Sequence, residues 1–166
     1  MDAENRLYAR FAEMGLPYEL VEHEATATVA DSERLAADMP GGRSKSLLLT
    51  DRDGRLVLAT LPGSRRADLQ AIGRLCGSKS RLSFALPETM QTVLGVEPGH
   101  LSPFALINDS AQRVGMVLID EALLRASPVW AHPLRNTASI GMAPEHLQAF
   151  VALHAAEHRT AGLAAA

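Results

Sequence analysis

The sequence predicts a single α+β domain, with a mixed, largely antiparallel sheet or barrel of about seven strands and helices around it. Three observations favour this class. The chain of 166 residues has the length of one ordinary domain. Short apolar runs typical of strands alternate irregularly with helical patterns. Several strand candidates are separated by turns rather than by helices, which indicates antiparallel pairing.

The N-terminal part predicts a helix, a strand and a second helix. Apolar residues at helical spacing indicate a helix over 2–14, and Gly15 stands where a C-cap belongs. Residues 17–22 predict a strand. A capping box that starts at Thr28 opens a helix over 28–38, and a Pro-Gly-Gly run ends it.

The middle of the chain predicts a hairpin followed by a helix. Strands are expected over 46–50 and 56–61, because the Asp-Arg-Asp-Gly sequence of 51–54 is a strong hairpin signal. Ser64 is expected to cap a helix that runs to residue 75.

Three further strands are interrupted by one clear helix. We expect strands over 82–85, 104–107 and 114–119, and a helix over 87–94 with proline at its first position. Asp120 is expected to cap a short helix.

The C-terminal part predicts two strands and a last helix. The strands cover 129–132 and 138–142, and Pro144 opens a helix with one apolar stripe. The small residues of 160–166 are expected to form a frayed tail. We find no repeat and no linker, so residues 1–166 are expected to be one domain.

Positive charge is concentrated in one segment. The net charge is −3, yet residues 43–81 carry nine basic and three acidic residues. Such asymmetry is typical of a polyanion-binding face on an acidic body. The alternative is that folding mixes these charges with acidic neighbours over the surface.

Several function classes are disfavoured. The apolar runs are too short to cross a membrane, and Asp2 and Glu4 make the N-terminus unlike a signal peptide. Cys76, the single cysteine, excludes an internal disulfide and lies on the apolar side of a predicted helix, so we interpret it as structural. A cytoplasmic protein is expected. The common nucleotide-binding and hydrolase motifs are missing, and we expect no cofactor.

One stretch of the sequence matches a known zinc-binding pattern. His154, Glu157 and His158 form an H-x-x-E-H sequence, the inverted zincin pattern. The three side chains lie near the end of a predicted surface helix, where histidine and glutamate are ordinary. We interpret them as a solvated helical face and expect no metal site.

Two polar residues and one loop are candidates for chemistry. Lys45, one of only two lysines, begins an apolar strand, where its ammonium is suited to hold a phosphate or polarise a carbonyl. His132 precedes Pro133, which fixes its backbone and presets the direction of its ring. The alternatives are a lysine that extends to solvent and a structural histidine. Gly99 and Pro103 delimit a stiff G-x-x-x-P loop.

Three segments together resemble the YbaK/ProX family, the free-standing relatives of the editing domain inserted in bacterial prolyl-tRNA synthetases. They are RSKSLLLTDRDGRLVLATLPG, LGVEPGHLSPFALIND and VWAHPLRNTASIGM. The resemblance implies the fold of that editing domain and a deacylase acting on mischarged tRNA(Pro). It also implies tRNA and, as a second partner, prolyl-tRNA synthetase.

The resemblance assigns roles to residues. The family's essential lysine matches Lys45, its substrate loop matches Gly99–Pro103, and its late histidine matches His132. Ser46 stands where relatives often carry asparagine. The expected substrate-binding residues are Ser46, His100, Ser102, Pro103, Phe104 and Asn136. The expected tRNA-binding residues are Arg43, Arg65, Arg66, Lys79 and Arg81. Candidate walls of the amino-acid pocket are Leu47, Phe104, Leu106 and Ile140.

The resemblance also favours one substrate. A proline-specific synthetase pocket rejects smaller alanine weakly, so a second site that admits alanine and excludes proline completes a double sieve. We therefore expect Ala-tRNA(Pro) as the substrate. Cys-tRNA(Pro) and a non-catalytic module that binds tRNA or the synthetase remain the alternatives.

Overall fold

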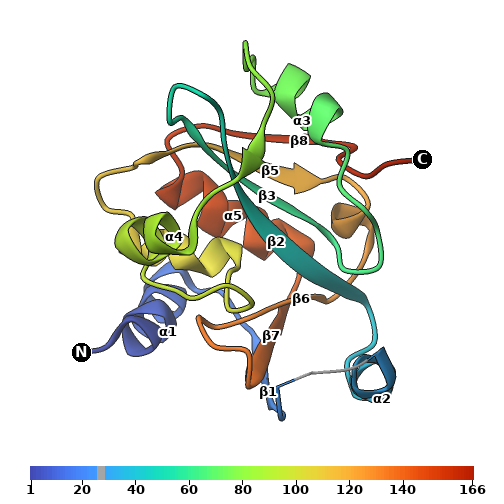
Figure 1. Cartoon of the computed structure of the whole chain (residues 1–166). Coiled ribbons are helices and arrows are strands. Elements are labelled where there is room, and N and C mark those ends of the chain that lie inside the picture. Colours follow the sequence, from blue (N-terminus) through green and yellow to red (C-terminus); the bar gives the residue numbers. More distant parts are fainter. Residues whose placement is uncertain (26–28) are drawn as a thin grey trace.

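The computed structural model describes residues 1–25 and 29–166, and Figure 1 shows one sheet with helices packed around it. The α-helices are α1 (Ala3–Met14), α2 (Val29–Asp38), α3 (Leu69–Leu75), α4 (Pro87–Leu94) and α5 (Pro144–His154). The strands are β1 (Glu19–Glu22), β2 (Gly42–Thr50), β3 (Leu56–Pro62), β4 (Ser83–Phe84), β5 (Val114–Asp120), β6 (Val129–Ala131), β7 (Ala138–Met142) and β8 (His158–Ala161). Two short 3-10 helices are η1 (Pro103–Asn108) and η2 (Leu123–Arg125).

The sheet is mixed and β2 is its central strand. Its order is β1-β7-β6-β2-β3-β5-β8, and β4 pairs with β2 beside this path. The β2–β3, β2–β4, β1–β7 and β6–β7 pairs are antiparallel, whereas β2–β6, β3–β5 and β5–β8 are parallel. The predicted mixed α+β class, with antiparallel pairs in the majority, is confirmed.

Each face of the central strands covers its own apolar cluster. Leu48 of β2 belongs to the larger cluster, in which Phe11 and Phe104 meet edge to face. Leu49 points to the opposite face and joins a smaller cluster with Ile72. Since side chains alternate along a strand, Lys45 and Leu47 share the face of Leu49, while Ser44 and Ser46 share the face of Leu48. Cys76 is buried in the smaller cluster, as a structural cysteine would be.

Most predicted helices and the first hairpin are present. Helix α1 ends at Gly15 in the left-handed conformation, with its backbone N–H bonded to Ala12 and Phe11. Strands β2 and β3 pair in register on either side of residues 51–54. Helices α4 and α5 each begin with the predicted proline. The predicted cap at Thr28 lies outside the described residues. No helix in the described ranges combines the length and the apolar character of a membrane span.

The strand predicted over 104–107 is wrong. These residues form η1, because Ser102 accepts a hydrogen bond from the Phe104 backbone N–H (3.2 Å) and Pro103 occupies the first helical position. A serine cap followed by proline is a helix-start signal, and here it prevails over the apolar run. The G-x-x-x-P loop therefore leads into a helical turn and not into a strand.

Two predicted caps are also corrected. Helix α3 begins at Leu69, and its cap is Asp68, whose carboxylate accepts a bond from Ala71 N–H (3.0 Å), instead of Ser64. The short helix expected after Asp120 is present as the 3-10 helix η2, but it has no side-chain cap, and Asp120 is buried. Its carboxylate accepts bonds from the backbone N–H groups of Ala122 (2.9 Å) and Leu163 (3.0 Å).

The tail predicted to fray is instead part of the fold. Strand β8 pairs with β5, and Leu163 is fully buried in the smaller apolar cluster. The Ala165 backbone N–H donates to the Arg66 carbonyl (2.7 Å). The prediction failed because the single buried leucine and the partner carboxylate of Asp120 are invisible in a composition of small residues.

Candidate functional site

Two hollows lie on either side of β2. One is an open groove of about 1340 Å³ between β2, α3, β4 and the segment before α3. The other is a smaller cavity of about 680 Å³, lined by residues of α2, β2, η2, β6 and β7. Ser44 lines the smaller cavity, whereas the next residue, Lys45, lines the groove. Ser64 lines both, so the two hollows approach each other at this point.

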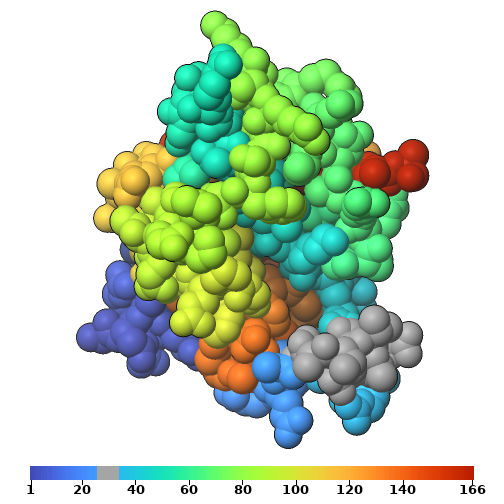
Figure 2. Space-filling view, viewed as in Figure 1, coloured from blue at the N-terminus to red at the C-terminus, as the bar shows by residue number. Residues whose placement is uncertain are grey.

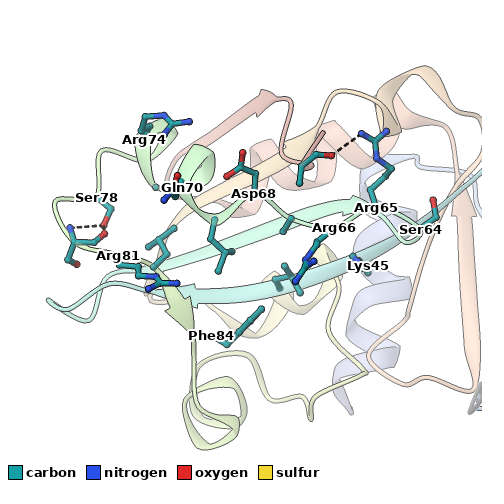
Figure 3. Close-up of a pocket in the computed structure, with 17 residues that line it drawn as sticks. Lys45, Ser64, Arg65, Arg66, Asp68, Gln70, Arg74, Ser78, Arg81 and Phe84 are labelled. Carbon is teal, nitrogen blue, oxygen red and sulfur yellow. Dashed lines mark hydrogen bonds between the residues drawn. The ribbon is translucent and has the colours of Figure 1, made fainter.

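The open groove is strongly basic. Figure 3 shows its lining side chains, which come from β2, from the segment before α3, from α3 and from the approach to β4. Its cationic members are Lys45, Arg65, Arg66, Arg74 and Arg81. Asp68 is the acidic residue in this lining, and its carboxylate is engaged as the cap of α3. The groove is therefore a surface that attracts anions.

Lys45 occupies the part of β2 nearest to the smaller cavity. It pairs with Leu61 of β3 and is half-buried. The neighbouring Ser46 faces the other way, and its hydroxyl bonds with the buried hydroxyl of Thr60 (2.7 Å). A serine in this position is thus a partner for a core hydroxyl in addition to any role in binding.

His132 lines the smaller cavity at the end of β6. Its Nδ1 lies 2.9 Å from the Ala138 carbonyl oxygen, so Nδ1–H donates and Nε2 is left as an acceptor. Burial lowers the pKa of His132, and the nearby His23, His100 and Arg43 lower it further, while the bond to Ala138 opposes the shift. A neutral imidazole with one free acceptor nitrogen is suited to orient water or an amine.

The Gly99–Pro103 loop lies directly against His132. The Ser102 hydroxyl donates to the His132 carbonyl oxygen (2.6 Å), which ties the loop to the end of β6. Figure 2 shows the yellow residues near 100 beside the orange residues that follow β6. Gly99 has a φ of +89°, a conformation that favours glycine, and a Cβ built there would meet no atom within 4 Å. The approach to this backbone is open.

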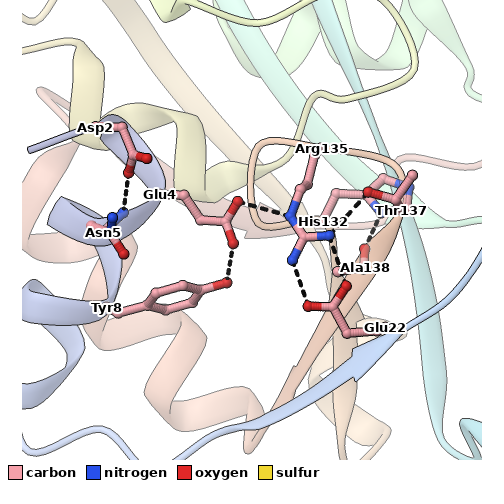
Figure 4. A network of polar contacts seen from close by, with 9 residues as sticks. All are labelled: Asp2, Glu4, Asn5, Tyr8, Glu22, His132, Arg135, Thr137 and Ala138. Atoms are coloured by element: carbon pink, nitrogen blue, oxygen red, sulfur yellow. Dashed lines mark hydrogen bonds and ion pairs between the residues drawn. The ribbon is translucent and has the colours of Figure 1, made fainter.

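The turn after His132 is held by ion pairs with α1 and β1. The Arg135 guanidinium bonds with Glu4 of α1 (2.8 Å) and Glu22 of β1 (2.8 Å), as Figure 4 shows. Tyr8 donates to the same Glu4 (2.7 Å), and burial together with this carboxylate raises the pKa of Tyr8. The network fixes the backbone that carries His132.

Some predicted site residues do not line either hollow. Phe104, Leu106 and Ile140 are buried in the larger apolar cluster, where Phe104 contacts Phe11 and Phe150. Pro103 is buried as well, and Lys79 is exposed outside the groove lining. Asn136 is half-buried in the turn after His132. Arg43 lines the smaller cavity and not the basic groove, while Leu47 does line the groove.

Sequence reasoning missed several residues that line the two hollows, of which His23, Ser139, Arg74 and Phe84 are the most informative. His23 follows the first predicted strand, and its Nε2 lies 2.9 Å from the hydroxyl of the buried Ser139. Its ring lies 6.2 Å from that of His132. Arg74 and Phe84 line the groove. For Phe84 a signal existed, since Leu82 and Phe84 are two residues apart on one predicted strand and therefore share a face.

The H-x-x-E-H sequence forms no helical face. Helix α5 ends at His154, and His158 lies in β8. Both ring nitrogens of His154 are engaged, with the Phe150 carbonyl (2.8 Å) and with Arg10 (2.7 Å). The interpretation as a solvated helical face was therefore wrong, although the described residues contain no cluster of three metal-ligating side chains.

Comparison with known proteins defines the class. The family model "Aminoacyl-tRNA editing domain" matches residues 23–150, and the chain belongs to this family. It is 31% identical to prolyl-tRNA editing protein ProX of Acetoanaerobium sticklandii over 152 residues, which is 91% of this chain and 92% of ProX. It is 32% identical to prolyl-tRNA synthetase associated domain-containing protein 1 of Bos taurus, over 87% of this chain and 86% of that protein.

Solved structures share the fold. The crystal structure of a proposed trans-editing enzyme for prolyl tRNA synthetase superposes with a TM-score of 0.78 and 24% identity, covering 100% of this chain and 99% of that one. The crystal structure of hypothetical protein APE2540 gives a TM-score of 0.76 at 20% identity, over 96% and 99% of the two chains.

Proposed function

We propose that this protein hydrolyses the aminoacyl ester of Ala-tRNA(Pro) and spares Pro-tRNA(Pro). The observation that carries the proposal is the position of Lys45, which lines the groove with several arginines and directly follows Ser44, a residue that lines the same cavity as His132. Membership of the editing-domain family and the name of the ProX relative support the same substrate class. The substrate would be met in the cytoplasm, and prolyl-tRNA synthetase, which would release it, is the expected protein partner.

In this proposal Lys45 holds the terminal phosphate or ribose through its ammonium. The backbone of the Gly99–Pro103 loop then lies against the ester carbonyl, and positioning supplies much of the rate. Water attacks the carbonyl carbon, the bond to the ribose oxygen breaks, and that oxygen takes up a proton. The neighbouring ribose hydroxyl and the free Nε2 of His132 are the groups proposed to orient the water.

No covalent intermediate is needed. The aminoacyl ester is already labile, and Cys76 is buried against the sheet, with its Sγ 3.5 Å from the Gly73 carbonyl oxygen. Discrimination against proline then rests on the size of the amino-acid pocket. A methylene difference in an apolar pocket is worth only ~1–3 kcal/mol, which explains why editing by exclusion requires a second site.

The test is deacylation of tRNA(Pro) charged separately with alanine, cysteine and proline, each with and without EDTA. We expect rapid hydrolysis of the alanyl ester, slow hydrolysis of the prolyl ester and no effect of EDTA. Preferential hydrolysis of the cysteinyl ester would replace the proposed substrate. Binding of all three without hydrolysis would identify a non-catalytic module, and loss of the rate in EDTA with recovery on adding zinc would refute the metal-free mechanism.

A further inference from the structure

The aromatic ring of Phe84 stands exposed inside the basic groove. Its fractional exposure is 61%, although large apolar side chains on a paired strand are usually covered. It lines the same groove as Arg66, Arg74 and Arg81, as Figure 3 shows. Single exposed apolar residues are common on protein surfaces and need no explanation. An exposed aromatic ring in a groove that is also lined by one lysine and four arginines is a more specific arrangement.

The sheet itself explains why this ring is uncovered. Phe84 of β4 pairs with Leu49 of β2, so it points to the same face as Leu49, Leu47 and Lys45. Leu82, two residues earlier, is buried under α3, where its side chain lies 3.8 Å from the position of a Cβ on Gly73. Helix α3 covers Leu82 but does not extend over Phe84. The ring therefore forms part of the floor of the groove.

We propose that Phe84 is a stacking platform for a base of single-stranded RNA, upstream of the terminal nucleotide of the tRNA acceptor end. The inference rests on the proposed function, because it takes the terminal ribose to lie at Lys45. Lys45 and the partner of Phe84 are four residues apart on β2, or about 13 Å at the ordinary rise of a strand. This separation is longer than one stacked nucleotide, so the base on Phe84 belongs to an earlier nucleotide.

The chemistry of the groove fits this ligand. Proteins hold single-stranded nucleic acid by stacking bases on aromatic side chains while cations follow the backbone. Here the aromatic side chain is Phe84 and the cations are Lys45, Arg65, Arg66, Arg74 and Arg81. Stacking reads no sequence, so it suits the unpaired end that all tRNAs share.

The experiment measures binding without hydrolysis. The probe is an uncharged RNA hairpin with the tRNA(Pro) acceptor stem and a single-stranded 3′ CCA end, and the reference is the same hairpin without that end. Phe84→Ala should weaken binding of the first hairpin about 5- to 100-fold. It should leave binding of the second hairpin unchanged, whereas Phe84→Tyr and Phe84→Trp should bind the first like the parent protein. With 2-aminopurine before the terminal nucleotide, the parent protein should quench the fluorescence and Phe84→Ala should not.

Leu86→Ala is the matched control. Leu86 is 66% exposed and two residues away, but it does not line the groove, so this change should leave RNA binding intact. Equal losses in Phe84→Ala and Leu86→Ala would overturn the inference. So would a Phe84→Ala variant that binds both hairpins normally but no longer self-associates in sedimentation, because the ring would then contact a second copy of the chain.

The two proposals fail separately. If Phe84 contributes to binding of the CCA end but no aminoacyl ester is hydrolysed, the inference stands and the proposed function falls. If Ala-tRNA(Pro) is hydrolysed and Phe84→Ala binds the CCA hairpin normally, the proposed function stands and the inference falls.

Discussion

Lys45 carries the sharpest prediction at the scale of single residues. Losing one preorganised electrostatic contact costs about 10²–10³ in rate, so Lys45→Ala should reduce single-turnover deacylation by that factor. Lys45→Arg should restore little, because a planar guanidinium replaces a compact charge. The fold should persist, since Lys45 is half-buried at the rim of the groove and belongs to neither apolar cluster.

The control for this prediction is Lys79, the second lysine of the chain. It is exposed and lies outside the groove lining, so Lys79→Ala should keep nearly the full rate at saturating tRNA. Thermal unfolding of each variant separates lost chemistry from lost folding. If Lys45→Ala keeps more than about a tenth of the parent rate, the lysine merely extends to solvent and the proposed site is wrong.

His132 predicts how stability depends on pH. Its pKa is lowered by burial from an ordinary value of 6.5, so below about pH 6.5 the unfolded chain binds more protons than the folded protein. Stability should thus be full above that pH and should fall as the pH decreases, until the lowered pKa of the folded state is passed. His132→Gln should flatten this decrease in urea unfolding between about pH 5 and 8.

A second histidine, His154, should contribute separately to the pH dependence of stability. Burial also lowers the pKa of His154, with Arg10 acting in the same direction, so His154→Gln should remove a separate part of the pH dependence. A His132→Gln variant as sensitive to pH as the parent protein would show that His132 titrates normally. At this scale the sequence singled out Lys45 and His132, which line the groove and the smaller cavity, and it missed His23, whose partner Ser139 is 116 residues away.

At the scale of elements, the Gly99 loop is tested by comparing two glycines. Gly99 (φ +89°) and Gly54 (φ +82°) both have left-handed backbones, and a Cβ on either would meet no atom within 4 Å. Alanine at either position should therefore destabilise the fold similarly, by about 1–2 kcal/mol. Neither glycine lines a hollow, but the Gly99–Pro103 loop is bonded to His132 through Ser102, whereas Gly54 belongs to the turn between β2 and β3. Only Gly99→Ala should therefore lower the deacylation rate. Similar rates in the two variants would remove the loop from the site.

The elements also show which patterns predict structure. Helix α4 and the turn between β2 and β3 were predicted, because a first-position proline and an Asp-Gly turn act locally, but β2 begins at Gly42, before the predicted start at residue 46. Helical turn η1 was missed because its apolar run resembles a strand, although its helix-start signal, Ser102 followed by Pro103, is local. Strand β8 was missed because its pairing partner and the carboxylate of Asp120 come from the middle of the chain.

At the scale of the whole molecule, the basic groove predicts how tRNA binding responds to salt. Phosphate contacts release counterions, so the apparent KM should rise steeply with salt. Replacing both Arg65 and Arg66 by alanine should raise KM more than it lowers kcat, and should make the salt dependence shallower. The matched control replaces Arg52 and Arg113 by alanine, which removes the same charge. Both arginines are exposed and line neither hollow. A flat salt response, or equal effects in the two double variants, would place the tRNA elsewhere.

The charge asymmetry of the sequence anticipated this groove only in part. The segment 43–81 does supply every cation in its lining, but folding sends Arg43 to the smaller cavity and leaves Lys79 outside. Alternation along β2 does not separate Arg43 from Lys45, which are two residues apart. Arg43 lies where β2 pairs with β6, opposite Trp130, whereas Lys45 lies beyond that pairing, opposite Leu61 of β3. Such a division depends on register, which no composition records.

The order of strands in the sheet has a consequence for synthesis on the ribosome. Within residues 1–25 and 29–166, the pairing partner of β1 is β7, so Glu19 pairs with Gly141, which is made roughly 120 residues later. At a synthesis rate of about 5–20 residues per second, some 6–24 s pass between the synthesis of β1 and that of its pairing partner. The turn that carries His132 is held by Glu22 at the end of that same strand. A nascent chain therefore cannot assemble the site piece by piece, and acquires it only after most of the protein has been made.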